Sequence, residues 1–141
     1  ATSSRLIPFH LPLFPLVCST HETLASRCQQ NPSLPFDDAS FDVVTSIYLF
    51  HELPPKIRAA VVREVARILK PGGGFVFVDT ILEGDHAPFD GLLARFPVQF
   101  HEPYYADYIR SDVDALFEAE GFEVAAVERA FLSRVMTLVK R

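Results

Sequence analysis

The feature that most constrains this chain is a strand, a helix and a second strand in direct succession between residues 41 and 80. The run FDVVTSIYLF is almost continuously apolar and rich in β-branched residues, which predicts a strand buried on both faces. A helix is predicted to begin at Pro54 and Pro55 and to end at Pro71 and Gly72. GFVFVDT is the second predicted buried strand. This order predicts two parallel strands joined by a right-handed crossover.

The predicted helix has two chemically different sides. Apolar residues recur at helical spacing and predict one buried face, made of Ile57, Val61, Val65, Ile68 and Leu69. The basic residues Arg58, Arg63 and Arg67 are interpreted as a solvated face rather than a nucleic-acid patch.

The rest of the chain predicts loops, two short helices and a strand pair. An aromatic stretch, FDGLLARFPVQFHEPYYADY, is interpreted mainly as loop, with a short helix over residues 91–96. Ser111 and Asp114 have capping-box spacing, and Gly121 is a predicted helix end. FEVAAVERA and SRVMTLVK are predicted strands, and the short link between them favours an antiparallel pair.

Charge and cysteine content exclude several classes of protein. The formal net charge is -5, whereas phosphate binding needs a basic surface, so we expect no nucleic-acid partner. No apolar run is long enough to span a bilayer, so we expect no membrane partner. Cys18 and Cys28 are too few for a disulfide framework and lack the paired spacing of a zinc site. We therefore predict a cytoplasmic protein without a metal site.

Three short motifs carry a resemblance to a known family. LPFDDASFDVV, FHELP and LKPGGGFVFVDT, in this order and spacing, resemble the C-terminal half of class I S-adenosylmethionine-dependent methyltransferases. EAEGFEVAAVE and the strand after it are similar to the end of that fold. The resemblance covers residues 34–141 and leaves residues 1–33 as an irregular N-terminal segment of unassigned origin. It implies an α/β fold class: a truncated Rossmann-like methyltransferase sheet, with parallel strands followed by a C-terminal antiparallel pair.

The resemblance implies methyl transfer from S-adenosylmethionine to a small-molecule acceptor, by in-line displacement helped mainly by proximity and orientation. The family's glycine-rich loop of G-x-G-x-G type is absent. Gly72, Gly73 and Gly74 follow a helix, whereas such a loop follows a strand and opens a helix. The alternative is therefore a non-catalytic fragment or remnant, or a module that self-associates through an exposed sheet edge. We expect the chain alone to bind S-adenosylmethionine very weakly or not at all.

Candidate site residues follow from the same resemblance. Ligands of open α/β sheets bind beyond the carboxyl ends of the strands. The residues expected near the cofactor are Asn31, Ser46, Ile47 and His51, and those expected near the substrate are Glu52, His101, Tyr104 and Tyr105.

Two of these assignments, and a possible contact of Asp79 with the site, have a structural alternative. His51 and Glu52 are either a general base or substrate clamp, or a structural loop pair. The second is favoured because many relatives transfer methyl groups by positioning alone, and no catalytic residue is assigned. The segment FHEPYYADY, which also contains Glu102 and Tyr108, is either an acceptor pocket or a loop packed by its rings. Asp79 either touches the site or caps the next turn, and the cap is favoured.

Overall fold

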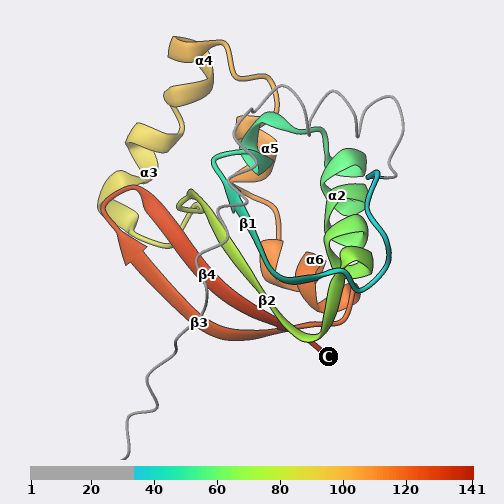
Figure 1. Ribbon diagram of the computed structural model, residues 1–141. Coiled ribbons are helices and arrows are strands. Elements are labelled where there is room, and N and C mark those ends of the chain that lie inside the picture. The colour runs from blue at the N-terminus through green and yellow to red at the C-terminus, as the bar shows by residue number, and fades with distance from the viewer. Residues whose placement is uncertain (1–33) are drawn as a thin grey trace, which may run out of the picture.

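The computed structural model describes residues 34–141 (Figure 1). The predicted segment 1–33 and Asn31 lie outside the described residues. Within them the strands are β1 (Phe41–Ile47), β2 (Leu69–Thr80), β3 (Phe122–Ala130) and β4 (Ser133–Lys140). The helices are the 3-10 turn η1 (Phe50–Glu52), α2 (Pro55–Ile68), α3 (Ala87–Leu93), α4 (Phe96–Phe100), α5 (Tyr105–Tyr108) and α6 (Val113–Ala119).

The four described strands form one sheet in the order β1-β2-β4-β3. β1 and β2 are parallel, whereas β4 is antiparallel to both β2 and β3. Helix α2 connects β1 to β2, as the crossover interpretation required. The predicted fold class, parallel strands followed by a C-terminal antiparallel pair, is confirmed.

One face of the sheet carries the core. Side chains alternate along β2, so Phe75 and Phe77 lie on the same face, where both are fully buried and contact Phe117 of α6. They form an aromatic cluster with Phe50, Phe117 and Phe122. The ring centroids of Phe77 lie 5.0 Å from those of Phe50 and of Phe117, in edge-to-face geometry. Packing within this cluster fixes the positions of η1 and α6 relative to the sheet.

The prediction that the first strand is buried on both faces is wrong. Val43 and Ile47 are 49% and 55% exposed. Within residues 34–141, β1 pairs only with β2 and therefore lies at the edge of the sheet. The strand also ends at Ile47, because Tyr48 takes a left-handed conformation (φ 50°) and the chain then enters η1.

The second strand begins earlier than predicted. Helix α2 ends at Ile68, and Leu69 is already extended and aligned with Phe41. The glycines therefore lie inside β2. At Gly73 a Cβ atom would lie 2.8 Å from the Lys70 carbonyl oxygen and 3.1 Å from that of Asp42, so a side chain does not fit there.

Two of the helix predictions also need correction. The single helix expected over residues 91–96 is replaced by α3 and α4, each with a proline in its first turn. The cap of α6 is Asp112, whose carboxylate accepts a hydrogen bond from the Ala115 amide at 2.9 Å. Ser111 instead donates from its hydroxyl to the carbonyl of Tyr108.

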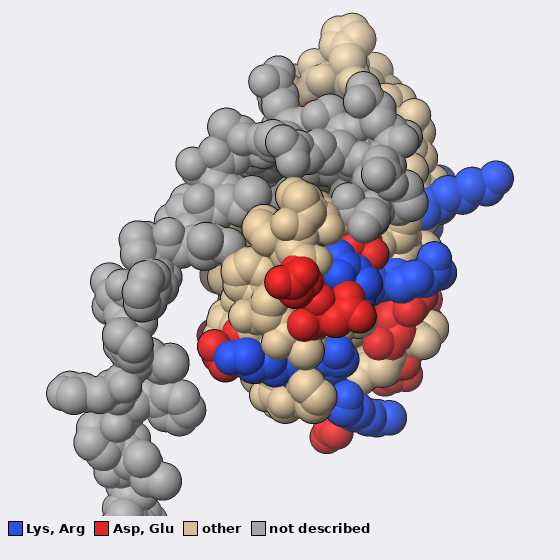
Figure 2. Space-filling view, turned by 45° about the vertical axis from the view of Figure 1, so that its right-hand side comes forward, with Lys and Arg blue, Asp and Glu red and all other residues tan. Residues whose placement is uncertain are grey.

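The surface over α2 carries both signs of charge. Figure 2 shows acidic and basic side chains intermixed on this face rather than a field of one sign. Arg67 accounts for part of this pattern, because it bonds to Glu64 and Asp38. These contacts raise the pKa of Arg67. No helix within residues 34–141 is long and apolar enough to cross a bilayer.

Candidate functional site

A pocket of about 430 Å³ opens where β1 and β2 end at their carboxyl sides. This is the edge of an open α/β sheet where ligands bind. Aromatic rings and leucine side chains together form most of its wall, and polar side chains line the rest. The lining includes Tyr48, Phe96, Phe100, Tyr105 and Phe131, with polar groups from His51, Glu52, Thr80, Glu102 and Ser133.

A buried aspartate fixes the polar centre of this pocket. Asp79, the penultimate residue of β2, is fully buried. Its Oδ2 accepts a hydrogen bond from the Phe50 amide at 2.8 Å, and its Oδ1 lies 2.6 Å from His51 Nδ1. The Thr80 amide also donates to Oδ1 at 2.7 Å. Asp79 therefore joins the end of β2 to the turn that follows β1, and does not merely cap its own turn.

The orientation of the His51 ring follows from this contact. A carboxylate oxygen accepts hydrogen bonds, so this contact favours the tautomer in which His51 Nδ1 carries the proton. Nε2 is then the atom that faces the pocket. The rings of Tyr105 and Tyr108 stand edge-on to the imidazole, with centroids at 5.7 and 6.3 Å. The side chain is thus held by one charge-assisted hydrogen bond and two aromatic neighbours.

The surroundings of His51 raise its pKa above the ordinary value of 6.5. Burial of the ring lowers the pKa, but the hydrogen bond and charge of Asp79 raise it, as do the charges of Glu52 and Glu102. Glu52 Oε1 lies 3.9 Å from Nε2. Three carboxylates therefore face one imidazole. One metal-ligand atom from each of His51, Glu52 and Glu102 lies within 4.8 Å of the other two, so these residues bear on the metal-binding capacity of the site.

Arg58 supports the site from beneath, and the prediction of a solvated arginine face is wrong for this residue. Arg58 is 2% exposed. Its guanidinium donates to the Phe50 carbonyl at 2.9 Å, to the Tyr104 carbonyl at 3.0 Å and to the Asp107 carboxylate at 2.7 Å. It also lies 5.3 Å from the centre of the Tyr108 ring. One side chain thus ties α2, η1 and α5 together behind the pocket.

The residues predicted near the cofactor do not gather at one place within residues 34–141. His51 lines the pocket. Ser46 and Ile47 are neighbours on β1, so their side chains point to opposite faces of the sheet. Ser46 is buried and its hydroxyl has no hydrogen-bond partner among the described residues, whereas Ile47 is exposed.

The residues predicted near the substrate divide in two. Glu52 and Tyr105 line the pocket. His101 is exposed, takes a left-handed conformation (φ 57°) and ends α4. Tyr104 is 37% exposed and contributes its carbonyl group to Arg58. Neither of these two side chains lines the pocket.

Several lining residues carried no signal in the sequence. Phe96, Phe131 and Ser133 come from segments whose strand or helix assignments gave no reason to bring them together, whereas Phe100 begins the segment FHEPYYADY that was a candidate pocket. Glu102 belongs to the segment FHEPYYADY, and the left-handed turn at His101 directs it to the pocket. Asp79 lies at the carboxyl end of a buried strand, which is why contact with the site was one of its two predicted roles.

Comparison with known proteins identifies the family. A family model described as "Methyltransferase domain" matches residues 17–77, so the match includes part of the segment 1–33. The sterol 4-C-methyltransferase strm-1 of Caenorhabditis elegans is 33% identical over 111 residues, which are 75% of this chain and 30% of that protein. The uncharacterized methyltransferase YcgJ of Bacillus subtilis is 37% identical over 91 residues, covering 62% of this chain and 33% of its own length. The chain spans less than half of either curated relative.

Solved structures share the fold at low sequence identity. A SAM-dependent methyltransferase from Methanosarcina mazei superposes with a TM-score of 0.56 at 22% identity, over 77% of this chain and 63% of its own. The [4+2]-cyclase SpnF superposes with a TM-score of 0.55 at 16% identity, over 77% and 53%. The chain belongs to the class I S-adenosylmethionine-dependent methyltransferase family, as its motifs indicated, and it holds a portion of that fold. A cyclase on the same fold means that activity must be argued from the site.

The Arg58 contacts predict a selective loss of stability. Arg58→Met removes the donors to the buried Phe50 carbonyl and to the partly buried Tyr104 carbonyl, and an orphaned buried group costs about 1–3 kcal/mol. We expect the free energy of unfolding, measured by urea denaturation, to fall by about 2–4 kcal/mol. Arg63→Met is the matched control, because the Arg63 side chain is 66% exposed and its pair with Glu120 lies at the surface. Equal effects of the two substitutions would contradict the structural role given to Arg58.

Proposed function

We propose that this chain supplies the acceptor-binding side of a methyltransferase that acts on a small molecule. The observation that carries the proposal is the aromatic pocket at the carboxyl ends of β1 and β2, with the His51 imidazole held in its wall. Rings with a few fixed polar groups suit a small organic acceptor. Family membership supports the reaction type, because S-adenosylmethionine supplies the transferred methyl group in this family.

The contribution of these residues to the reaction is mainly positional. Tyr48, Phe96 and Tyr105 give flat apolar walls that exclude water and restrict how an acceptor lies. His51 Nε2 and the hydrogen-bonded hydroxyl pair of Tyr48 and Ser133 offer polar contacts that fix its orientation. Holding an acceptor in a productive geometry removes a large part of the activation free energy for transfer between two bound molecules.

The described residues fit the acceptor better than the cofactor. Ser46 and Ile47 face opposite sides of β1, and Asn31 lies outside the described residues. Losing several hydrogen-bonding partners at about 1–3 kcal/mol each removes roughly three decades of affinity, at about 1.4 kcal/mol per decade. The Kd of this chain alone for the cofactor is therefore expected to be above about 1 mM.

A titration followed by ¹H–¹⁵N NMR tests both halves of this proposal. A small phenol should shift the amide signals of Thr80, Tyr105 and Ser133, with a Kd of about 1 mM, as is usual for a fragment-sized ligand. S-adenosylhomocysteine should cause no saturable shift in the same range. Tyr105→Leu should weaken the phenol response, whereas Val98→Leu, at an 83% exposed position on α4, should leave it unchanged.

Two outcomes would change the proposal. Phenol shifts that avoid the pocket, or none at all, would contradict an acceptor site. Micromolar binding of S-adenosylhomocysteine would instead contradict the weak cofactor affinity and would remove the interpretation of the chain as a remnant.

A second candidate, a self-associating module, rests on the edge strand. Within residues 34–141, β1 offers unpaired backbone groups together with the exposed side chains of Val43 and Ile47. A long apolar edge of this kind favours pairing with another strand, and a lysine at the edge opposes it.

Sedimentation velocity tests this second candidate. The wild-type chain should sediment as a mixture of monomer and dimer that shifts with concentration. Val43→Lys should shift it to monomer, whereas Val98→Lys should not, because Val98 lies on α4 and away from the edge. A wild-type chain that stays monomeric at high concentration would exclude the module.

A further inference from the structure

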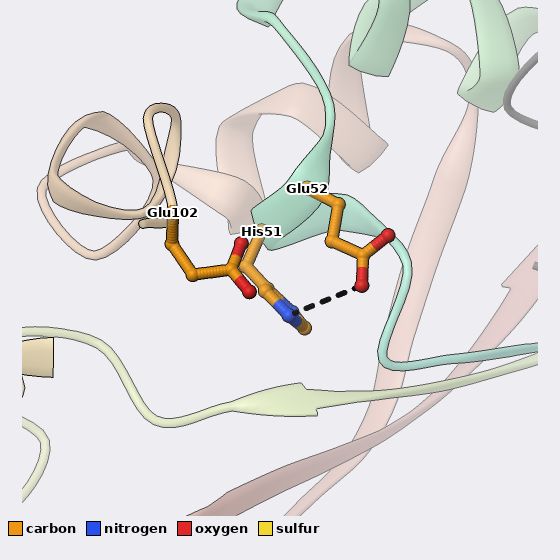
Figure 3. A group of neighbouring side chains, drawn as sticks. All are labelled: His51, Glu52 and Glu102. Atoms are coloured by element: carbon orange, nitrogen blue, oxygen red, sulfur yellow. Dashed lines mark ion pairs between the residues drawn. The ribbon is translucent and has the colours of Figure 1, made fainter. Parts of the chain in front are cut away.

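Three side chains of metal-ligand type meet in the pocket. His51 and Glu52 come from η1, and Glu102 comes from the distant turn after α4. One donor atom from each lies within 4.8 Å of the other two. Figure 3 shows the two carboxylates on either side of the imidazole, directed toward the same space. Small side-chain rotations would bring all three donors onto one ion, because both glutamates carry flexible side chains.

The imidazole is already arranged as metal-binding histidines usually are. Such histidines donate the proton of one ring nitrogen to a carboxylate, which fixes the tautomer and leaves the other nitrogen for the metal. His51 does this with the fully buried Asp79, at 2.6 Å. His51 itself is 8% exposed, and its Nε2 forms no hydrogen bond within residues 34–141. The nearby Glu52 oxygen, at 3.9 Å, is beyond hydrogen-bonding distance.

Backbone contacts place Glu102 independently of His51. The left-handed His101 turns the chain after α4, and the Glu102 amide donates to the Pro97 carbonyl at 3.2 Å. The Tyr105 amide in turn donates to the Glu102 carbonyl at 3.3 Å. Both ends of this turn are therefore held, so the meeting of Glu102 with His51 is a property of the fold rather than of one mobile side chain.

We propose that His51, Glu52 and Glu102 bind one divalent transition-metal ion, with Zn²⁺ as the probe of choice. One imidazole and two carboxylates match open zinc sites in the number of protein ligands, and both ligand types bind zinc; in such sites a water or substrate takes the next position. The imidazole favours Zn²⁺ over Mg²⁺ or Ca²⁺, which prefer oxygen ligands only. The open position would face the pocket. If the proposed function holds, an acceptor oxygen could occupy it; the metal site itself does not depend on that function.

Calorimetric titration of the full chain with ZnCl₂ tests the proposal. Thiolates also bind zinc, so Cys18→Ser and Cys28→Ser are introduced first in every variant. We expect one ion per chain with micromolar or tighter affinity. Glu102→Gln keeps the size of the side chain but weakens a ligand, and we expect at least a tenfold loss of affinity. Glu118→Gln, at an exposed position on α6, is the matched control and should bind as the parent does.

A second variant separates the metal site from a folding defect. Asp79→Asn leaves all three ligands in place but weakens the hold on the imidazole, for which losses of about 10–100-fold in metal affinity are typical. NMR spectra of each variant without metal show whether it is folded. Zinc-induced shifts should centre on His51 and Glu102. Zinc affinity that is unchanged in Glu102→Gln, shifts confined to other histidines, or no binding at 1 mM zinc would each overturn the proposal. Any of these results would leave the phenol and cofactor titrations unaffected.

Discussion

The carboxylate of Asp79 is the contact on which the arrangement of the site depends. A buried carboxylate is costly unless it is well hydrogen-bonded. Here it accepts from two backbone amides and from the His51 ring. Because Asp79 lies at the end of β2, these contacts hold the turn after β1 against that end of the strand. The charge is thereby satisfied, the imidazole is oriented, and the two parallel strands end at a common point where the pocket opens.

Other contacts extend this constraint to the rest of the pocket. Arg58 donates a hydrogen bond to the Phe50 carbonyl on the other side of the same turn. It donates another to the Asp107 carboxylate on α5. The Tyr108 hydroxyl donates to the Thr80 carbonyl at 3.3 Å, which brings α5 back to the end of β2. These contacts connect η1, α2, α5 and the end of β2 behind the pocket. A change in any one of them is expected to alter the position of His51.

The sequence was sufficient for the parts of the fold that follow from local pattern. Periodicity and proline positions predicted the crossover from β1 through α2 to β2, and the short link at Phe131 predicted the antiparallel pair. The apolar pattern of β1 is equally compatible with burial on both faces, so its edge position within residues 34–141 was expected only from the resemblance to a truncated sheet. The prediction that Arg58 is solvated was wrong for a similar reason. Helical spacing gives the direction of a side chain but does not show which other element covers it.

The site was predictable only where chain position and chemistry coincide. His51, Glu52 and Tyr105 were found because they follow a strand end or belong to an aromatic motif. Glu102 reaches the same space through a left-handed residue at His101, a conformation that histidine adopts without a clear local signal. The absence of a predicted metal site has the same origin, since His51 and Glu52 alone do not resemble one.

The tautomer of His51 tests this account most directly. Long-range ¹H–¹⁵N NMR spectra identify which ring nitrogen carries the proton. They should be recorded with chelator present and above the raised pKa of His51, so that the ring is neutral. The account predicts a protonated Nδ1 and a bare Nε2 in the wild-type chain. A neutral ring with its proton on Nε2 would contradict it, because Asp79 would then not orient the imidazole toward the pocket.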